Sequence, residues 1–303
     1  MATRKKGSIA IPFLVTFLIG LLIIGGFVFY LYGNLGMNQK EELDDMDAAE
    51  IKSATYEDSH TILFVLDVPE VKCSSTFIVM RSVPKEKKIL LTGVPANTIE
   101  IIDGQQENLG ELYKNSGVTA AEKFIETISG TEIDRYMIFN EEAFLKLSDI
   151  LGGVSYAVTV DIAGFEDTDK EQYLNGKQAL SLITYPLFGG GEFERASMAA
   201  SVLSAMVNQS DRQSLKDGFE RSFNTLINLT ESNITAGDYK KLAYPIEFMI
   251  EPNLSNSVIS HFSMLEGISD TDYFVLEKFY SDDIIQEYFT DKSEKKDSKK
   301  KGK

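Results

Sequence analysis

The feature that most constrains this chain is an uncharged, apolar run over residues 9–32, rich in Ile, Leu, Phe, Val and Gly. At ~1.5 Å per residue, a helix of this length crosses a hydrocarbon core of ~30 Å. A cleavable signal peptide is the alternative, but its apolar part is only ~7–15 residues long and ends in small residues. The end of this run, residues 27–32, is aromatic and aliphatic instead. We therefore predict one N-terminal transmembrane helix.

The charges on either side of the run predict its orientation. Residues 4–6 are Arg-Lys-Lys, whereas residues 41–45 (EELDD) are mostly acidic. Because basic flanks stay in the cytoplasm, residues 1–8 are expected to be the cytoplasmic end. The chain is then a single-pass protein of the cell membrane. Its polar stretch 33–59 is expected to be a stalk, and the folded part lies outside the cell.

The charge and the cysteine content limit the partners. The formal net charge is -16 although both ends are basic, so the segment between them is strongly acidic. Such a domain repels a phosphate backbone, which disfavours nucleic acid as a partner and favours divalent cations. Cys73 is the only cysteine, so neither an intramolecular disulfide nor a cysteine metal cluster can form. Residues 291–303 are Lys-rich without apolar side chains and are expected to be a disordered tail.

Three apolar runs follow the stalk. Residues 61–68 (TILFVLDV) are almost continuously apolar, which is typical of a strand buried on both faces. Residues 75–83 and 87–94 are two further runs of strand length, and the Pro-Lys-Glu between them predicts a hairpin. We therefore expect a buried sheet to begin here.

Helical periodicity then alternates with short strands. Residues 119–128 place apolar side chains on one face behind a capping Thr119, and residues 141–151 do the same before a glycine pair. Strands are predicted at residues 135–139 and 155–162. Interleaved helices and strands indicate a mixed α/β fold whose sheet is covered on both faces.

Several short strings resemble those of one protein family. LGGV (residues 151–154), LNGKQAL (residues 174–180) and NITAGDYKKLA (residues 233–243) are similar to strings of the LytR-CpsA-Psr (LCP) family of bacterial envelope proteins. They stand in that family's order, behind a single N-terminal span. The resemblance covers roughly residues 61–243.

The resemblance implies a three-layer α/β/α sandwich over residues 60–244, followed by an extension, residues 245–290, packed on or beside it. The pocket of such a domain holds a polyprenyl (pyro)phosphate lipid, and active members transfer a glycopolymer from this carrier onto peptidoglycan. That chemistry needs a divalent cation such as Mg²⁺, held by carboxylates, and arginines that pair with phosphate oxygens. The implied partners are the membrane, a polyprenyl-linked lipid or cell-wall glycopolymer, and other LCP proteins.

The charged site of the family is only partly present in this sequence. Its first-strand aspartate falls on Asp67, the expected metal ligand and cofactor-binding residue. Its Arg-Ser-Asp-Thr falls on residues 73–76 (Cys-Ser-Ser-Thr) and its Pro-Arg-Asp-Thr on residues 95–98 (Pro-Ala-Asn-Thr), so arginines and carboxylates are missing from both. Its Arg-x-Arg falls on residues 184–186 (Thr-Tyr-Pro), which removes further positive charge.

Two charged residues survive at the following helix. The family's Gly-Asp-x-x-Arg falls on residues 191–195 (Gly-Glu-Phe-Glu-Arg), and its Arg-Gln-Gln falls on residues 198–200 (Met-Ala-Ala). Glu192 is then a candidate for cofactor binding, and Arg195 is the catalytic candidate. Each assignment has an alternative: Asp67 as a turn residue, and Arg195 in a local ion pair with a neighbouring glutamate.

These replacements set the order of the functional hypotheses. Removing one partner of a charge-assisted contact costs ~2–5 kcal/mol, so the loss of several is expected to weaken or abolish pyrophosphate transfer. The leading hypothesis is a membrane-anchored envelope protein that keeps the LCP fold and binds the carrier, or assists active relatives. One alternative is an active metal-dependent phosphotransferase that relies on Asp67, Glu192 and Arg195. The other is a regulatory protein of the transcriptional-attenuator type, although the acidic domain disfavours direct DNA contact.

Overall fold

The computed structural model describes residues 54–69, 75–165, 169–252, 258–270 and 272–291. The predicted membrane span 9–32, Cys73 and the tail beyond residue 291 lie outside these ranges. Among the residues that are described, no helix combines the length and the apolarity needed to cross a membrane.

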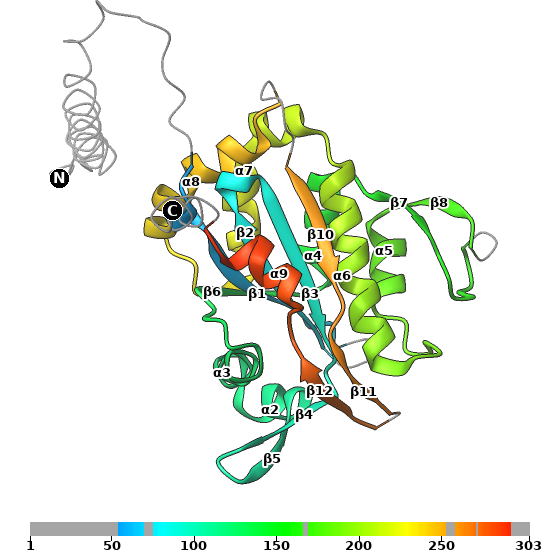
Figure 1. Cartoon of the computed structure of the whole chain (residues 1–303). Coiled ribbons are helices and arrows are strands. Elements are labelled where there is room, and N and C mark those ends of the chain that lie inside the picture. The colour runs from blue at the N-terminus through cyan, green and yellow to red at the C-terminus, as the bar shows by residue number, and fades with distance from the viewer. Residues whose placement is uncertain (1–53, 70–74, 166–168, 253–257, 271, 292–303) are drawn as a thin grey trace, which may run out of the picture. The chain divides into compact units, whose positions relative to one another are not determined.

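A six-stranded sheet forms the centre of the fold, in the order β10-β3-β2-β1-β6-β9 (Figure 1). Its strands are β1 (His60–Leu66), β2 (Thr76–Val83), β3 (Lys88–Val94), β6 (Arg135–Phe139), β9 (Glu231–Ser232) and β10 (Ile259–Ser263). The strands β1, β2 and β3 are antiparallel neighbours, whereas β6 runs parallel to β1 and β10 runs parallel to β3. The strands predicted for the three apolar runs and for residues 135–139 are therefore confirmed, with small shifts at their ends.

The hairpin of β2 and β3 forms where the sequence predicts it. The short helix η2 (Pro84–Glu86) connects the strands, and Pro84 begins it because its fixed φ suits a first helical position. Lys87 then turns the chain with a φ of 52° before β3 starts. The two apolar runs and the Pro-Lys-Glu between them are adjacent in the sequence, and the hairpin forms at these residues.

Helices cover both faces of the central sheet (Figure 1). One face carries α4 (Glu141–Leu151), α5 (Gly176–Ile183), α6 (Gly191–Gln209), α7 (Arg212–Leu229) and α8 (Ala236–Ile250). The other carries α2 (Leu109–Ser116), α3 (Val118–Ser129), α9 (Asp282–Ile284) and its π-helical continuation η3 (Ile285–Phe289). In β1, Phe64 and Leu66 face the first layer, and Leu63 and Val65 face the second. The near-continuous apolar run reflects this double burial, and the expected mixed α/β fold is confirmed.

Two sequence predictions need correction. Thr119 does not cap α3: the N-cap residue is Gly117, whose φ of 79° lets α3 follow α2 directly, so the helix starts before Thr119. The strand predicted over residues 155–162 ends early. The strand β7 (Val154–Ala157) pairs only with the four residues of β8 (Glu171–Leu174), and Val158 is buried in the core without extending the ladder.

The region 245–290 contributes strands to two sheets. The helix α8 runs through the boundary that we drew at residue 244, and β10 then joins the central sheet beside β3. A second sheet, in the order β11-β12-β4-β5, combines β11 (Glu266–Ser269) and β12 (Phe274–Lys278) with β4 (Thr98–Ile102) and β5 (Gln105–Asn108). Phe274 and Tyr288 share the core beneath α2 and α3. The domain also begins before β1, because Ala54 is buried and η1 (Tyr56–Asp58) precedes the first strand.

Candidate functional site

A cleft of about 1070 Å³ lies where β1 ends. Several of the positions that the resemblance singles out meet here, although they come from five separate stretches of the chain. Those that line the cleft are Asp67, Ser75, Ala96, Asn97, Pro186 and Glu192. The structure therefore brings Asp67 and Glu192 to the same cleft.

Asp67 is fixed at its backbone and at both carboxylate oxygens. Its N–H donates to the carbonyl of Phe139 at 2.9 Å, which ties the end of β1 to β6. The Ser75 hydroxyl donates to Oδ1 at 3.1 Å, and the Tyr113 hydroxyl donates to Oδ2 at 3.1 Å. Ser75 stands at a position where the resemblance expects a carboxylate, and here it gives Asp67 a hydrogen-bond donor. Burial and the charge of Asp67 raise the pKa of Tyr113, which keeps its hydroxyl protonated.

Arg195 lies behind the cleft wall rather than in the cleft. Its side chain is only 2% exposed, and its guanidinium forms a two-pronged ion pair with Glu192, through Nε at 2.8 Å and through Nη2. The other donors reach the Thr76 hydroxyl at 2.6 Å and the carbonyls of Ile183 and Ser75 at 3.3 Å each. All five N–H groups of this arginine therefore have partners. The local ion pair that the sequence offered as an alternative is present, and a phosphate would have to displace one of these contacts.

The cleft has more negative than positive side chains. Among the described residues, Asp67, Glu111 and Glu231 line it together with Lys114, while the charge of Glu192 is balanced by Arg195. Within the part of the chain that the structure describes, the buried Oδ1 atom of Asn97 has no hydrogen-bond partner. This arrangement repels a free anion and offers oxygen ligands to a cation.

A second, smaller cavity of about 240 Å³ lies between the sheet and the helices α7 and α8. Most of its lining is apolar: Ile62, Met80, Met137, Phe219, Phe223, Leu226, Ile227, Ile234, Leu242, Ala243 and Ile246. Ile62, within β1, lines this cavity, whereas Asp67, just after the end of β1, lines the cleft. The stacked rings of Phe64 and Phe139, 4.3 Å apart, lie in the core on the same face of the sheet.

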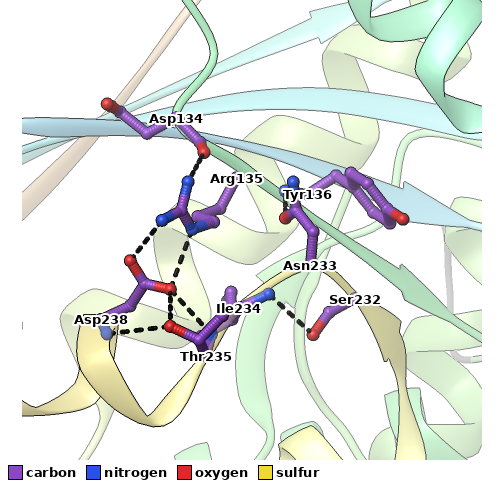
Figure 2. A network of polar contacts seen from close by, with 8 residues as sticks. All are labelled: Asp134, Arg135, Tyr136, Ser232, Asn233, Ile234, Thr235 and Asp238. Atoms are coloured by element: carbon purple, nitrogen blue, oxygen red, sulfur yellow. Dashed lines mark hydrogen bonds and ion pairs between the residues drawn. The ribbon is translucent and has the colours of Figure 1, made fainter.

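One ion pair joins the sheet to α8 beside this cavity. Figure 2 shows Arg135 between the carbonyl of Asp134 and the carboxylate of Asp238. Arg135 donates to Asp238 through Nε at 2.9 Å and Nη2 at 2.6 Å. Asp238 also accepts the N–H and the hydroxyl of Thr235, the N-cap residue of α8, at 2.7 Å each. A single carboxylate therefore caps α8 and fastens it to β6.

The substitution Asp238→Asn tests this fastening through its pH dependence. The hydrogen bonds from Arg135 hold the pKa of Asp238 well below its usual range, so the charged form stabilises the fold. We expect the variant to lose about 1 kcal/mol of unfolding free energy near pH 7. A carboxyl whose pKa is depressed by folding contributes this stability above its unfolded pKa of ~3.9, and the contribution disappears as the pH falls through the folded pKa. The gap to the wild type, measured by urea denaturation, should be constant from pH 7 to 5 and shrink below about pH 4.

Asp282→Asn is the matched control. Asp282 accepts a hydrogen bond from Lys278 at 2.9 Å, but its side chain is 92% exposed. Solvent screens such a pair, so this variant should show no measurable change at any of these pH values. Equal losses in both variants would contradict the role given to the Arg135–Asp238 pair.

Sequence reasoning missed the polar residues that α2 and β9 bring to the cleft. Tyr113 and Lys114 lie on α2, and Glu231 lies on β9, far along the chain from Asp67. None belongs to a recognisable string. Only the weak apolar face of α2 could have marked Tyr113, and a tyrosine on such a face is more often a core residue.

The fold and its cavities define an α/β domain that combines an acidic cleft with a separate apolar cavity. The chain belongs to the LytR_cpsA_psr family, whose model matches residues 28–277. The predicted family is therefore confirmed. No curated protein matches the sequence.

Solved structures have a similar fold. A protein from Eubacterium siraeum described as a transcription regulator is 18% identical with a TM-score of 0.63, over 77% of this chain and 92% of that one. TagV from B. subtilis is 19% identical with a TM-score of 0.52, over 72% and 91% of the two chains. TagT, solved bound to LIIa-WTA, is 19% identical with a TM-score of 0.52, over 73% and 86%. At these identities the likeness concerns the fold alone.

Proposed function

We propose that this chain is a membrane-anchored, extracytoplasmic LCP protein of cell-envelope assembly that binds a polyprenyl (pyro)phosphate carrier and has lost most transfer activity. One observation carries the proposal: the cleft is built at the family's site, yet Ser75, Ala96, Asn97 and Pro186 stand where the family has charged groups. The fold is retained, but fewer charged side chains are available to bind a phosphate. Such a protein holds the carrier, or supports active LCP proteins, without turning it over.

The saturated guanidinium of Arg195 supports the reduced activity. Stabilising the charge that develops on a transferred phosphoryl group requires donors that are free to meet it. The N–H groups of Arg195 donate to Glu192, Thr76 and backbone carbonyls instead. At ~1.4 kcal/mol per factor of ten, the absence of two charge-assisted contacts slows transfer by several orders of magnitude.

A divalent cation fits the remaining oxygen atoms. No group of three or more His, Cys, Asp or Glu residues that could hold a metal ion occurs in the described part of the chain. Mg²⁺, however, is commonly held by one or two carboxylates together with the phosphates of its ligand. Asp67 and the unpartnered Oδ1 of Asn97 would supply the protein's share. Bound there, the cation would neutralise pyrophosphate charge in an acidic cleft.

The apolar cavity supports a lipid ligand. Its lining, drawn from the sheet, α7 and α8, suits a short segment of a hydrocarbon chain, and hydrocarbon burial contributes ~0.8 kcal/mol per CH₂ group. TagT, which has a similar fold, was solved bound to LIIa-WTA. We extend that chemistry to this chain as a proposal: its partners are the membrane and a lipid-linked envelope glycopolymer, not nucleic acid.

Titration of the full chain in detergent with geranyl pyrophosphate and Mg²⁺ tests the proposal. We expect Mg²⁺-dependent binding without release of phosphate, and a polyprenyl phosphate should be found by mass spectrometry of lipids that copurify with the chain. Cleavage at the rate of an active LCP enzyme would favour the alternative, a working phosphotransferase built on Asp67. Neither bound lipid nor titratable binding would overturn carrier binding.

Returning one charge to the cleft provides a sharper comparison. Pro186→Arg places a guanidinium at an exposed cleft position where the family has arginine, and one charge-assisted hydrogen bond contributes ~1.5 kcal/mol or more. Binding of geranyl pyrophosphate should tighten about tenfold. Leu187→Arg adds the same charge one residue away, at a side chain that is 74% exposed and outside the cleft lining. Equal effects of the two variants would mean that the ligand responds to net charge and not to this site.

A further inference from the structure

The carboxylate of Asp67 is oriented by two neutral hydroxyl groups. Ser75 reaches Oδ1 and Tyr113 reaches Oδ2, each at 3.1 Å, so both oxygens have a fixed donor. The backbone of Asp67 is fixed as well, through its N–H to the carbonyl of Phe139 at 2.9 Å. Each oxygen retains a lone pair for a further ligand, because a carboxylate oxygen can accept two hydrogen bonds.

Glu192 provides the contrast within the same cleft. Its carboxylate is paired with the guanidinium of Arg195, which cancels its charge as well as fixing its geometry. A hydroxyl donor fixes geometry and leaves the negative charge in place. Asp67 is therefore oriented by neutral donors, whereas Glu192 is held as part of a buried ion pair. These are the different requirements of a cation ligand and of a structural carboxylate.

The position of the Tyr113 hydroxyl is determined by packing. Tyr113 lies on α2, which Asn108 caps by accepting the N–H of Glu111 at 3.1 Å. The Tyr113 ring meets the fully buried ring of Phe77 edge to face, with centroids 5.4 Å apart and planes at 82°. Phe77 is part of β2, in the core of the sheet. Packing on Phe77 therefore holds the ring in place, and the hydroxyl of Tyr113 reaches Asp67 in the cleft, which Tyr113 lines.

We propose that Tyr113 is a positioning residue that holds Asp67 in the orientation needed to ligate a divalent cation on a prenyl pyrophosphate. The proposal rests on the proposed function, because it assumes that Asp67 takes part in cation binding. Tyr113 acts through Asp67 and touches neither the cation nor the phosphate. Hydrogen-bond partners of metal ligands typically control metal affinity by a factor of ~10–100. The structure supplies such a partner from a helix that no sequence string had marked.

Tyr113→Phe isolates the hydroxyl, since it keeps the ring that packs on Phe77. The measurement uses the full chain in detergent, with Mn²⁺ as the probe and saturating geranyl pyrophosphate, and free Mn²⁺ is counted by electron paramagnetic resonance. Mn²⁺ affinity should fall ~10–100-fold in Tyr113→Phe. Tyr156→Phe is the matched control, because it removes a hydroxyl that donates to Ser201 at 2.7 Å, away from the cleft lining. That control should bind Mn²⁺ as the wild type does.

Testing Tyr113→Phe in the Asp67→Asn variant as well distinguishes a positioning role of Tyr113 from a general loosening of the fold. In Asp67→Asn, Mn²⁺ binding should already be lost or weak, and adding Tyr113→Phe should change it no further. If Tyr113→Phe binds Mn²⁺ like the wild type, or weakens it equally in both backgrounds, the positioning role is overturned. If Tyr113→Phe and Tyr156→Phe lose affinity alike, it is overturned too. If the wild type holds no Mn²⁺ with the pyrophosphate, cation binding in the proposed function fails, and the role of Tyr113 fails with it.

Discussion

Replacing Arg195 with methionine is expected to lower the free energy of unfolding by about 3–5 kcal/mol, because it breaks a buried ion pair and leaves one partner behind. The arginine is 2% exposed, and it joins α6 to β2 and to the end of α5 through Thr76, Ser75 and Ile183. Without it, Glu192 keeps a charge that is only partly hydrated, and three acceptors lose their donor. Urea denaturation followed by circular dichroism measures the loss, which suits a chain without tryptophan.

The double variant Arg195→Met/Glu192→Met is the control for this prediction. Replacing both partners of a buried pair with apolar side chains of similar size is often nearly neutral. The double variant should therefore recover much of the stability that Arg195→Met loses. If Arg195→Met were within 1 kcal/mol of the wild type and only ligand binding fell, Arg195 would be a ligand-binding residue and its structural assignment would be wrong.

The charged residues of the site differ in their structural partners. Arg195 pairs with Glu192 and holds α6 against the sheet through Thr76 and Ile183. Asp67 is hydrogen-bonded to Ser75 and Tyr113 instead. The expected contribution of Arg195 to stability therefore does not depend on whether the site binds a ligand.

The parts of the fold that could be predicted from sequence are those with local signals. The strands β1, β2 and β3 are apolar runs, and Gly130 and Gly152 end α3 and α4 with φ values of 65° and 94°. The second sheet could not be predicted, because β11 is exposed along its whole length and pairs with β12 across a turn without a clear signal. The strand β12 also pairs with β4, which lies far away in the sequence, and such pairing depends on tertiary context.

The candidate site, too, could be predicted only in part from the sequence. The resemblance singled out Asp67 and Glu192 from separate stretches of the chain, and the structure brings both residues to one cleft. It could not reveal that the guanidinium of Arg195 is fully occupied, since that depends on carbonyls of Ser75 and Ile183, which any residue type provides. Tyr113 was missed because its partner lies 46 positions away.

Gly93→Ala is expected to cost about 3 kcal/mol of unfolding free energy, at the upper end of the usual range for overpacking. Gly93 lies on β3, where the backbone of α6 crosses the sheet. A Cβ atom there would stand 2.0 Å from the carbonyl oxygen of Ala196 and 2.4 Å from its carbonyl carbon, and neither backbone atom can move alone. The helix would have to shift away from the sheet. Because Ala196 follows Arg195, the ion pair behind the cleft would shift as well, and binding of geranyl pyrophosphate should weaken together with stability.

Gly218→Ala makes the same chemical change with the opposite expected sign. Gly218 lies inside α7, and an added Cβ would meet only the Ser222 hydroxyl at 3.6 Å, an ordinary contact. Alanine in a helix interior is favoured over glycine by ~0.8–1.0 kcal/mol, so this variant should be more stable than the wild type, with unchanged ligand binding. The two variants distinguish a glycine required by a close backbone contact, Gly93, from a glycine at an ordinary helix position, Gly218. If both variants lost stability alike, the loss at Gly93 would not come from the contact with α6, and that contact would not be what sets the position of Arg195.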